Sequence, residues 1–215
     1  MTDPGMGCGI SAPADAGDGQ PAHLRGALLR RSALLGGAAL ASGGLVTALA
    51  RGGLQSPTAR DERILNYVLR LEHLKAAFYR EAVERGALSG ELEQLATLLA
   101  RHEEAHVAFF EKRLGGKAEK ARVYDFGEAT RDPDTFAATA NKLEEAAVAA
   151  YIGQGANLTR SLMAPFAGLC SVEARHAAWI ADVLQSDPAP SAADKAKAPK
   201  EVARIIEDLG FEANG

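Results

Sequence analysis

Cysteine is scarce in this chain, with only Cys8 and Cys170 among 215 residues. If the start of the chain is removed, Cys170 has no partner and no disulfide framework exists, so packing and metal must hold the fold together. We expect Cys170, on one face of a predicted helix, to act as a small buried apolar group rather than as a redox group or a ligand.

Strongly basic segments are also missing. The net charge is −4, the pI is about 5.8 and no run of lysine and arginine occurs. This balance argues against nucleic acid or an anionic membrane surface as a partner and favours cations. The apolar share of 47% with 24% charged residues is typical of a globular protein with a sizeable core.

The first 50 residues differ from the rest. Residues 1–28 are rich in Gly, Pro, Ala and Asp, a composition typical of disorder. Arg30 and Arg31 then precede an uncharged Ala/Gly/Leu stretch that ends in Ala-Leu-Ala at 48–50, which resembles a twin-arginine export signal. We therefore predict a leader and signal over 1–50, a linker over 51–58, and export to the periplasm, cell envelope or medium.

Two other interpretations of the apolar stretch remain open, namely a buried helix and an uncleaved membrane anchor. The stretch lacks a polar face, and its four glycines make it only mildly hydrophobic for a span. We expect no stable membrane span after signal cleavage.

The remaining residues show helical periodicity between signals for helix ends, such as Gly86 and Gly115, and for a helix start at Pro133. The four long helices are expected at 59–85, 89–114, 133–154 and 159–185. A long irregular crossover separates the second helix from the third, and a short helix is expected at 201–209. The fold class predicted is an all-α four-helix bundle over 59–186, followed by a linker and a C-terminal helix over 187–215.

The pattern Glu-x-x-His occurs twice, as Glu103 with His106 and as Glu173 with His176. Residues three apart lie on the same face of a helix, so each pair directs a carboxylate and an imidazole towards one point. That combination suits a metal ion.

Each pair has an acid upstream in a second repeated pattern, Leu-Glu-x6-Tyr, which contains Glu72 with Tyr79 and Glu144 with Tyr151. The two copies of each pattern are separated by nearly the same number of residues, so the sequence predicts a helix pair that occurs twice. Folding the pairs together would gather Glu72, Glu103, His106, Glu144, Glu173 and His176. Four carboxylates and two imidazoles in this arrangement are the ligands of di-iron and di-manganese bundles, and two divalent ions balance four carboxylates.

Single positions leave alternatives. Glu145 competes with Glu144 as a ligand, but Glu144 keeps the repeated spacing and has apolar neighbours. Glu72 can instead pair with Lys75 on a solvated helix edge. Tyr79 and Tyr151 are expected to hydrogen-bond behind the ligands rather than to relay electrons.

Several stretches resemble the ferritin-like domain family that includes bacterial exported ferritin-like proteins and plant desiccation-related proteins. They are Leu-Glu-His-Leu at 71–74, Ala-Ala-Phe-Tyr at 76–79, Tyr-Asp-Phe-Gly at 124–127, Leu-Glu at 143–144, Ala-Ala-Tyr-Ile-Gly at 149–153 and Val-Glu-Ala-Arg-His-Ala-Ala at 172–178. The resemblance spans about 60–186 and implies a ferritin-like bundle in which Glu103 and Glu173 bridge two ions. Lys75 departs from the family, where Glu is expected, and a cation there is expected to weaken metal binding or shift the chemistry.

The function expected from the ligands and the resemblance is a dinuclear centre of iron or manganese rather than zinc, acting as a di-metal oxidoreductase on Fe(II), peroxide or an organic substrate. A non-enzymatic stress-protective or structural bundle is the alternative. A weaker one is a zinc protease, because His102 to His106 reads His-Glu-x-x-His; however, Val172 stands where the second copy would need its first histidine. No catalytic residue beyond the ligands is predicted, and a homo-oligomer is compatible with the sequence.

Overall fold

Helix α3, Ala59–Arg85, is the first element in the computed structural model, which describes residues 56–211. Its start is a capping box in which Thr58 and Asp61 each bond the other's backbone N–H, at 3.2 and 2.9 Å. It ends at Gly86, whose φ of 62° is the left-handed conformation that glycine adopts readily. The bounds of this helix match the prediction. The predicted signal and most of the linker lie outside the described residues.

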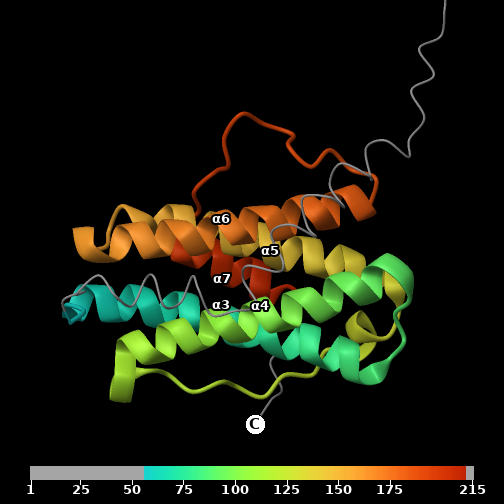
Figure 1. The fold of residues 1–215 in the computed structure, drawn as a ribbon, viewed down its shortest axis with the longest axis horizontal. Helices are drawn as coiled ribbons and strands as arrows, with labels where there is room; N and C mark the ends of the chain where they lie inside the picture. Colours follow the sequence, from blue (N-terminus) through green and yellow to red (C-terminus); the bar gives the residue numbers. More distant parts are fainter. Residues whose placement is uncertain (1–55, 212–215) are drawn as a thin grey trace, which may run out of the picture. The chain divides into compact units, whose positions relative to one another are not determined.

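Helix α4, Gly90–Leu114, returns alongside α3 as the second half of a helical hairpin (Figure 1). Ser89 occupies the predicted N-cap position, but its side chain makes no capping hydrogen bond. A short 3-10 turn, η1 (Gly115–Lys117), follows the helix, and the crossover contains a second one, η2 (Gly127–Thr130). Phe126 is buried just before η2, which packs the crossover onto the bundle as expected.

Helices α5, Pro133–Gly155, and α6, Arg160–Val183, form the second hairpin (Figure 1). Asp132 caps α5 through a 2.8 Å bond from the Thr135 N–H, and Pro133 takes the first helical position as predicted.

Helix α5 continues through Gly153 and ends at Gly155, one residue beyond the predicted end. A Cβ at Gly153 would overlap the carbonyl oxygen of Lys197, and the Lys197 N–H bonds the Ala149 carbonyl oxygen at 3.1 Å. The glycine therefore serves a close approach of two backbone segments.

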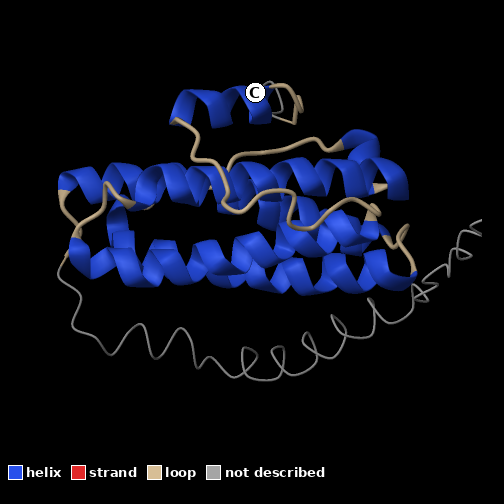
Figure 2. Ribbon diagram, turned by 90° about the horizontal axis from the view of Figure 1, so that it is seen from above, coloured by secondary structure: helices blue, strands red, loops and turns tan. Residues whose placement is uncertain are grey.

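The two hairpins pack into one bundle, seen from two sides in Figures 1 and 2. The described residues are helical with no strand, which confirms the predicted fold class. Apolar side chains form two clusters on opposite sides of the bundle's middle. One includes Phe78 and Phe136, and the other includes Leu65, Phe110 and Phe166. In each of the four bundle helices, the predicted ligands lie between a segment of one cluster and a segment of the other. The middle layer of the bundle is therefore polar, with an apolar cluster on either side of it.

Helix α7, Pro199–Glu207, lies beside the bundle rather than within it (Figure 2). Val202 is fully buried against Leu71, Ala146 and Ala150, which joins α7 to α3 and α5. The helix starts and ends two residues earlier than predicted. In the described part of the chain, no helix is both long and apolar enough to cross a membrane.

Candidate metal centre

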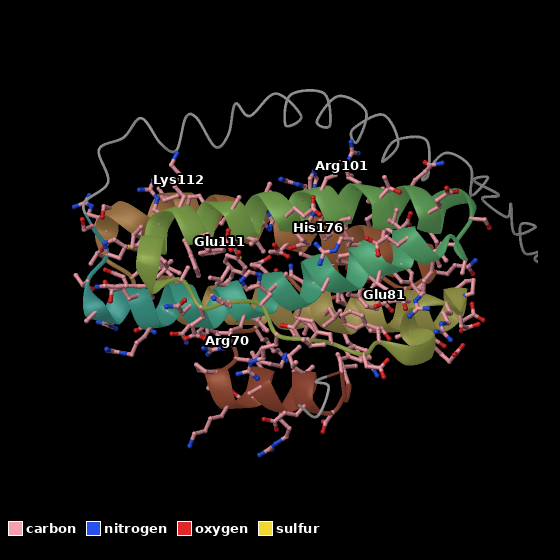
Figure 3. All side chains as sticks on the ribbon, turned by 90° about the horizontal axis from the view of Figure 1, so that it is seen from below. Arg70, Glu81, Arg101, Glu111, Lys112 and His176 are labelled. Carbon is pink, nitrogen blue, oxygen red and sulfur yellow. The ribbon has the colours of Figure 1, made fainter. Side chains whose placement is uncertain are left out.

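The six predicted ligands meet in the middle layer of the bundle. The side chains of Glu72, Glu103, Glu144 and Glu173 are completely shielded from solvent, and His106 and His176 are only 5% and 3% exposed. Figure 3 shows His176 inside the bundle, whereas Arg101 and Lys112 lie on the outer side. Each helix of the bundle contributes one of the acids, α3 and α5 singly and α4 and α6 together with a histidine.

Their donor atoms form two overlapping groups, each with all atoms within 4.8 Å of one another. The first group is Glu72, Glu103, His106 and Glu173, and the second is Glu103, Glu144, Glu173 and His176. Glu103 and Glu173 belong to both. Each group could hold a metal ion, and the two groups share two carboxylates.

The donor atoms lie close to one another but make no hydrogen bonds with one another. His106 Nδ1 lies 2.8 Å from Glu173 Oε1, and His176 Nδ1 lies 3.2 Å from Glu103 Oε1. None of these four atoms has a well-directed hydrogen bond among the described residues. Buried polar atoms are rarely left so. Carboxylate oxygens and imidazole nitrogens are donors that Fe and Mn ions accept, so the residues fit such an ion.

Lys75 lies among the same carboxylates. Its ammonium is 2.9 Å from Glu103 Oε2, 3.3 Å from Glu144 Oε2 and 3.4 Å from Glu72 Oε2, and it also pairs with Glu173 Oε2. The side chain is only 1% exposed. The alternative pairing of Lys75 with Glu72 therefore exists. However, it lies in the buried interior and not on a solvated helix edge.

Burial and the neighbouring cations divide the acids into two kinds. Burial dominates in Glu72 and Glu144, raising the pKa to about 8 and about 7. In Glu103, burial is outweighed by the positive charges of Lys75 and His106, which hold the pKa well below its usual range. The neighbouring carboxylates also raise the pKa of His106 and His176 in spite of burial. Binding of a metal cation is therefore expected to release protons from this cluster.

Two tyrosines connect the hairpins behind the ligands. The Tyr79 hydroxyl on α3 donates to Glu144 Oε1 on α5 at 2.6 Å, and the Tyr151 hydroxyl on α5 donates to Glu72 Oε1 on α3 at 2.9 Å. Each tyrosine thus holds the acid of the other repeat, rather than the one in its own Leu-Glu-x6-Tyr pattern. Each leaves the second oxygen of its acid directed towards the site, which supports the expected hydrogen-bonding role.

We expect Tyr151→Phe to weaken metal binding about 10- to 100-fold, because groups that orient a ligand usually have effects of this size. The measurement is competition of the metal-depleted protein with a chelating dye for Mn²⁺. Tyr124→Phe, in the crossover, is the control. Equal affinities of Tyr151→Phe and wild type would show that Glu72 needs no orienting bond.

His102, the first histidine of the His-Glu-x-x-His pattern, lies beside the site. Its Nδ1 lies 2.9 Å from His176 Nε2, and burial, with His176 nearby, lowers the pKa of His102 to about 4. A neutral His102 can accept a hydrogen bond from His176 Nε2–H, which leaves His176 Nδ1 free for a metal. His102 belongs to neither donor group, so the His-Glu-x-x-His pattern does not form the ligand set of a zinc protease.

Other predicted details concern the surroundings. Glu145 is exposed while Glu144 is buried, which decides between them. Trp179 packs on an apolar cluster, and its indole N–H donates to Glu91 at 3.1 Å. Cys170 is half-buried against apolar side chains, and burial raises the pKa of its thiol to about 11, so it is a poor nucleophile.

The fold and the site together define an all-α bundle with a buried cluster of carboxylates and histidines suited to a metal ion. The chain belongs to the ferritin-like domain family, whose sequence model matches residues 60–186, more than half of the chain. The match confirms the resemblance and coincides with helices α3 to α6. No match to a curated protein was found.

Proposed function

We propose that this ferritin-like bundle binds iron or manganese through its six central ligands and serves as an oxidoreductase centre. The observation that carries the proposal is the convergence of buried donor atoms that make no hydrogen bond in the described part of the chain. They are both histidine Nδ1 atoms, both oxygens of Glu103 and one oxygen each of Glu72 and Glu173. Hard carboxylates with two imidazoles favour iron and manganese over softer metals.

The bound metal would supply one-electron redox chemistry, with Fe(II), peroxide or an organic compound as the substrate. The chain supplies the rest of the site. Glu103 and Glu173 contribute to both donor groups, and Tyr79 and Tyr151 hold Glu144 and Glu72 in place. The apolar clusters on both sides exclude water from the ligands.

The proposal includes export, which rests on the twin-arginine-like residues Arg30 and Arg31 and the apolar stretch after them. Such export carries proteins that are already folded, so the metal would be loaded in the cytoplasm.

A second candidate is a bundle without metal chemistry that protects or supports the cell envelope. The observation that favours it is Lys75, whose ammonium already contacts all four acids. In this case the polar layer would be an ion-pair network, and metal content would be incidental.

Elemental analysis of protein prepared without chelators separates the candidates. We expect at least one iron or manganese per chain in wild type and in Glu145→Ala, which alters an exposed acid beside Glu144. The double variant Glu173→Ala with His176→Ala should hold no metal and lose oxygen-dependent oxidation of added Fe(II). Metal-free wild type, or a double variant with unchanged metal content and oxidation rate, would contradict the proposal.

A further inference from the structure

Lys75 makes ion pairs with acids from all four helices of the bundle. Every ion pair recorded for it in the described part of the chain ends on one of the four central acids, and in each the partner atom is Oε2. Two of these acids, Glu103 and Glu173, are the ones that both donor groups share. The ammonium therefore lies at the junction of the two groups rather than beside one of them.

The side chain has no alternative place for its charge. Lys75 is one turn from Glu72 on the same face of α3, and the residues on either side of this layer belong to the apolar clusters. A buried ammonium without a partner is very costly. Moving it away from the carboxylates would leave it among apolar side chains, so it is expected to stay where it is.

An ammonium at this junction competes with metal ions for both space and charge. It engages the Oε2 atoms of Glu103 and Glu173, the acids that two ions would have to share. Two divalent ions would balance the four carboxylates alone and leave the lysine charge uncompensated a few ångströms away. One divalent ion with Lys75 leaves a single excess negative charge, which one proton on a carboxylate removes.

Donor atoms for one ion remain available beside the ammonium. Glu103 Oε1 and Glu173 Oε1 make no ion pair with Lys75, and each lies close to a histidine Nδ1. We propose that Lys75 is a built-in cation that takes the place of one of two metal ions, so that this bundle binds one metal ion per chain. The inference rests on the proposed function, since it concerns how many ions the same site accepts.

The test is the number of Mn²⁺ ions bound by metal-depleted full-length chain, measured by equilibrium dialysis with elemental analysis. Wild type is expected to bind one ion per chain, and Lys75→Met, which removes the charge at similar length, to bind two. The matched control Lys112→Met removes an exposed lysine on the outside of α4 and should bind one (Figure 3). Lys75→Gln serves as a second variant in case the methionine variant does not fold.

Electron paramagnetic resonance gives an independent readout. A single Mn²⁺ in wild type should give the six-line spectrum of an isolated ion, whereas two ions sharing carboxylates in Lys75→Met should show magnetic exchange. Two ions per chain in wild type, or one ion in both folded Lys75 variants, would overturn the inference while leaving metal binding intact. Absence of bound Mn²⁺ and Fe²⁺ from wild type and variants alike would instead defeat the proposed function, and the inference with it.

Discussion

Metal-free protein carrying Lys75→Met is expected to unfold with a free energy about 3–5 kcal/mol lower than that of metal-free wild type, the usual loss when one partner of a buried ion pair is removed. The physical reason is that Lys75 contacts all four carboxylates in a layer that water does not reach. Without the ammonium, the acids must either repel one another or take up protons.

The measurement is urea unfolding of chelator-treated protein followed by circular dichroism. Lys112→Met should stay within about 0.5 kcal/mol of wild type, because exposed substitutions seldom do more. Adding Mn²⁺ should restore much of the stability of Lys75→Met, since a ligand that binds only the folded state stabilises it. Equal stability of the metal-free Lys75→Met and wild-type proteins would show that Lys75 does not neutralise the acids.

The convergence of the six donor residues could be predicted because it follows from local geometry. Residues three apart share a helix face, so Glu103 and His106 had to point the same way once α4 formed. The repeat of both patterns then related Glu72 to Glu144 without any knowledge of the tertiary structure. The helix bounds were similarly local, set by Thr58, Gly86 and Pro133.

The surroundings of Lys75 depended on contacts between helices and could not be predicted in the same way. Spacing shows only that Lys75 lies one turn from Glu72, and an isolated α3–α4 hairpin would leave such a residue at an edge. Packing of α5 and α6 converts that edge into the interior, because Glu144 and Glu173 come from those helices.

The hydrogen-bond partners of Tyr79, Tyr151 and His102 could not be predicted for the same reason. Spacing puts Tyr79 on the face of Glu72, but two turns separate them, and the hydroxyl reaches the acid of the facing helix instead. His102 precedes Glu103, so it points to a different side of α4, where it meets His176 of α6. The role of Gly153, which lets the Lys197 backbone approach α5, likewise depends on a contact between segments far apart in the sequence.

Glu103→Ala is expected to lower the affinity for Mn²⁺ by more than about 100-fold, because loss of a ligand should exceed the 10- to 100-fold cost of losing a group that merely orients one. Glu103 belongs to both donor groups, so its removal damages the site whichever group holds the ion. Glu72 and Glu144 belong to one group each. If a single ion binds, only one of the variants Glu72→Ala and Glu144→Ala should approach the effect of Glu103→Ala, and that variant identifies the group in use.

Affinities are measured by dye competition on metal-depleted proteins whose circular dichroism matches wild type. The matched control is Glu104→Ala, which alters the next residue of α4, exposed and 3.9 Å from Arg80. It should bind Mn²⁺ as wild type does. A folded Glu103→Ala that retains wild-type affinity would remove Glu103, one of the two carboxylates common to both donor groups, from the ligand set.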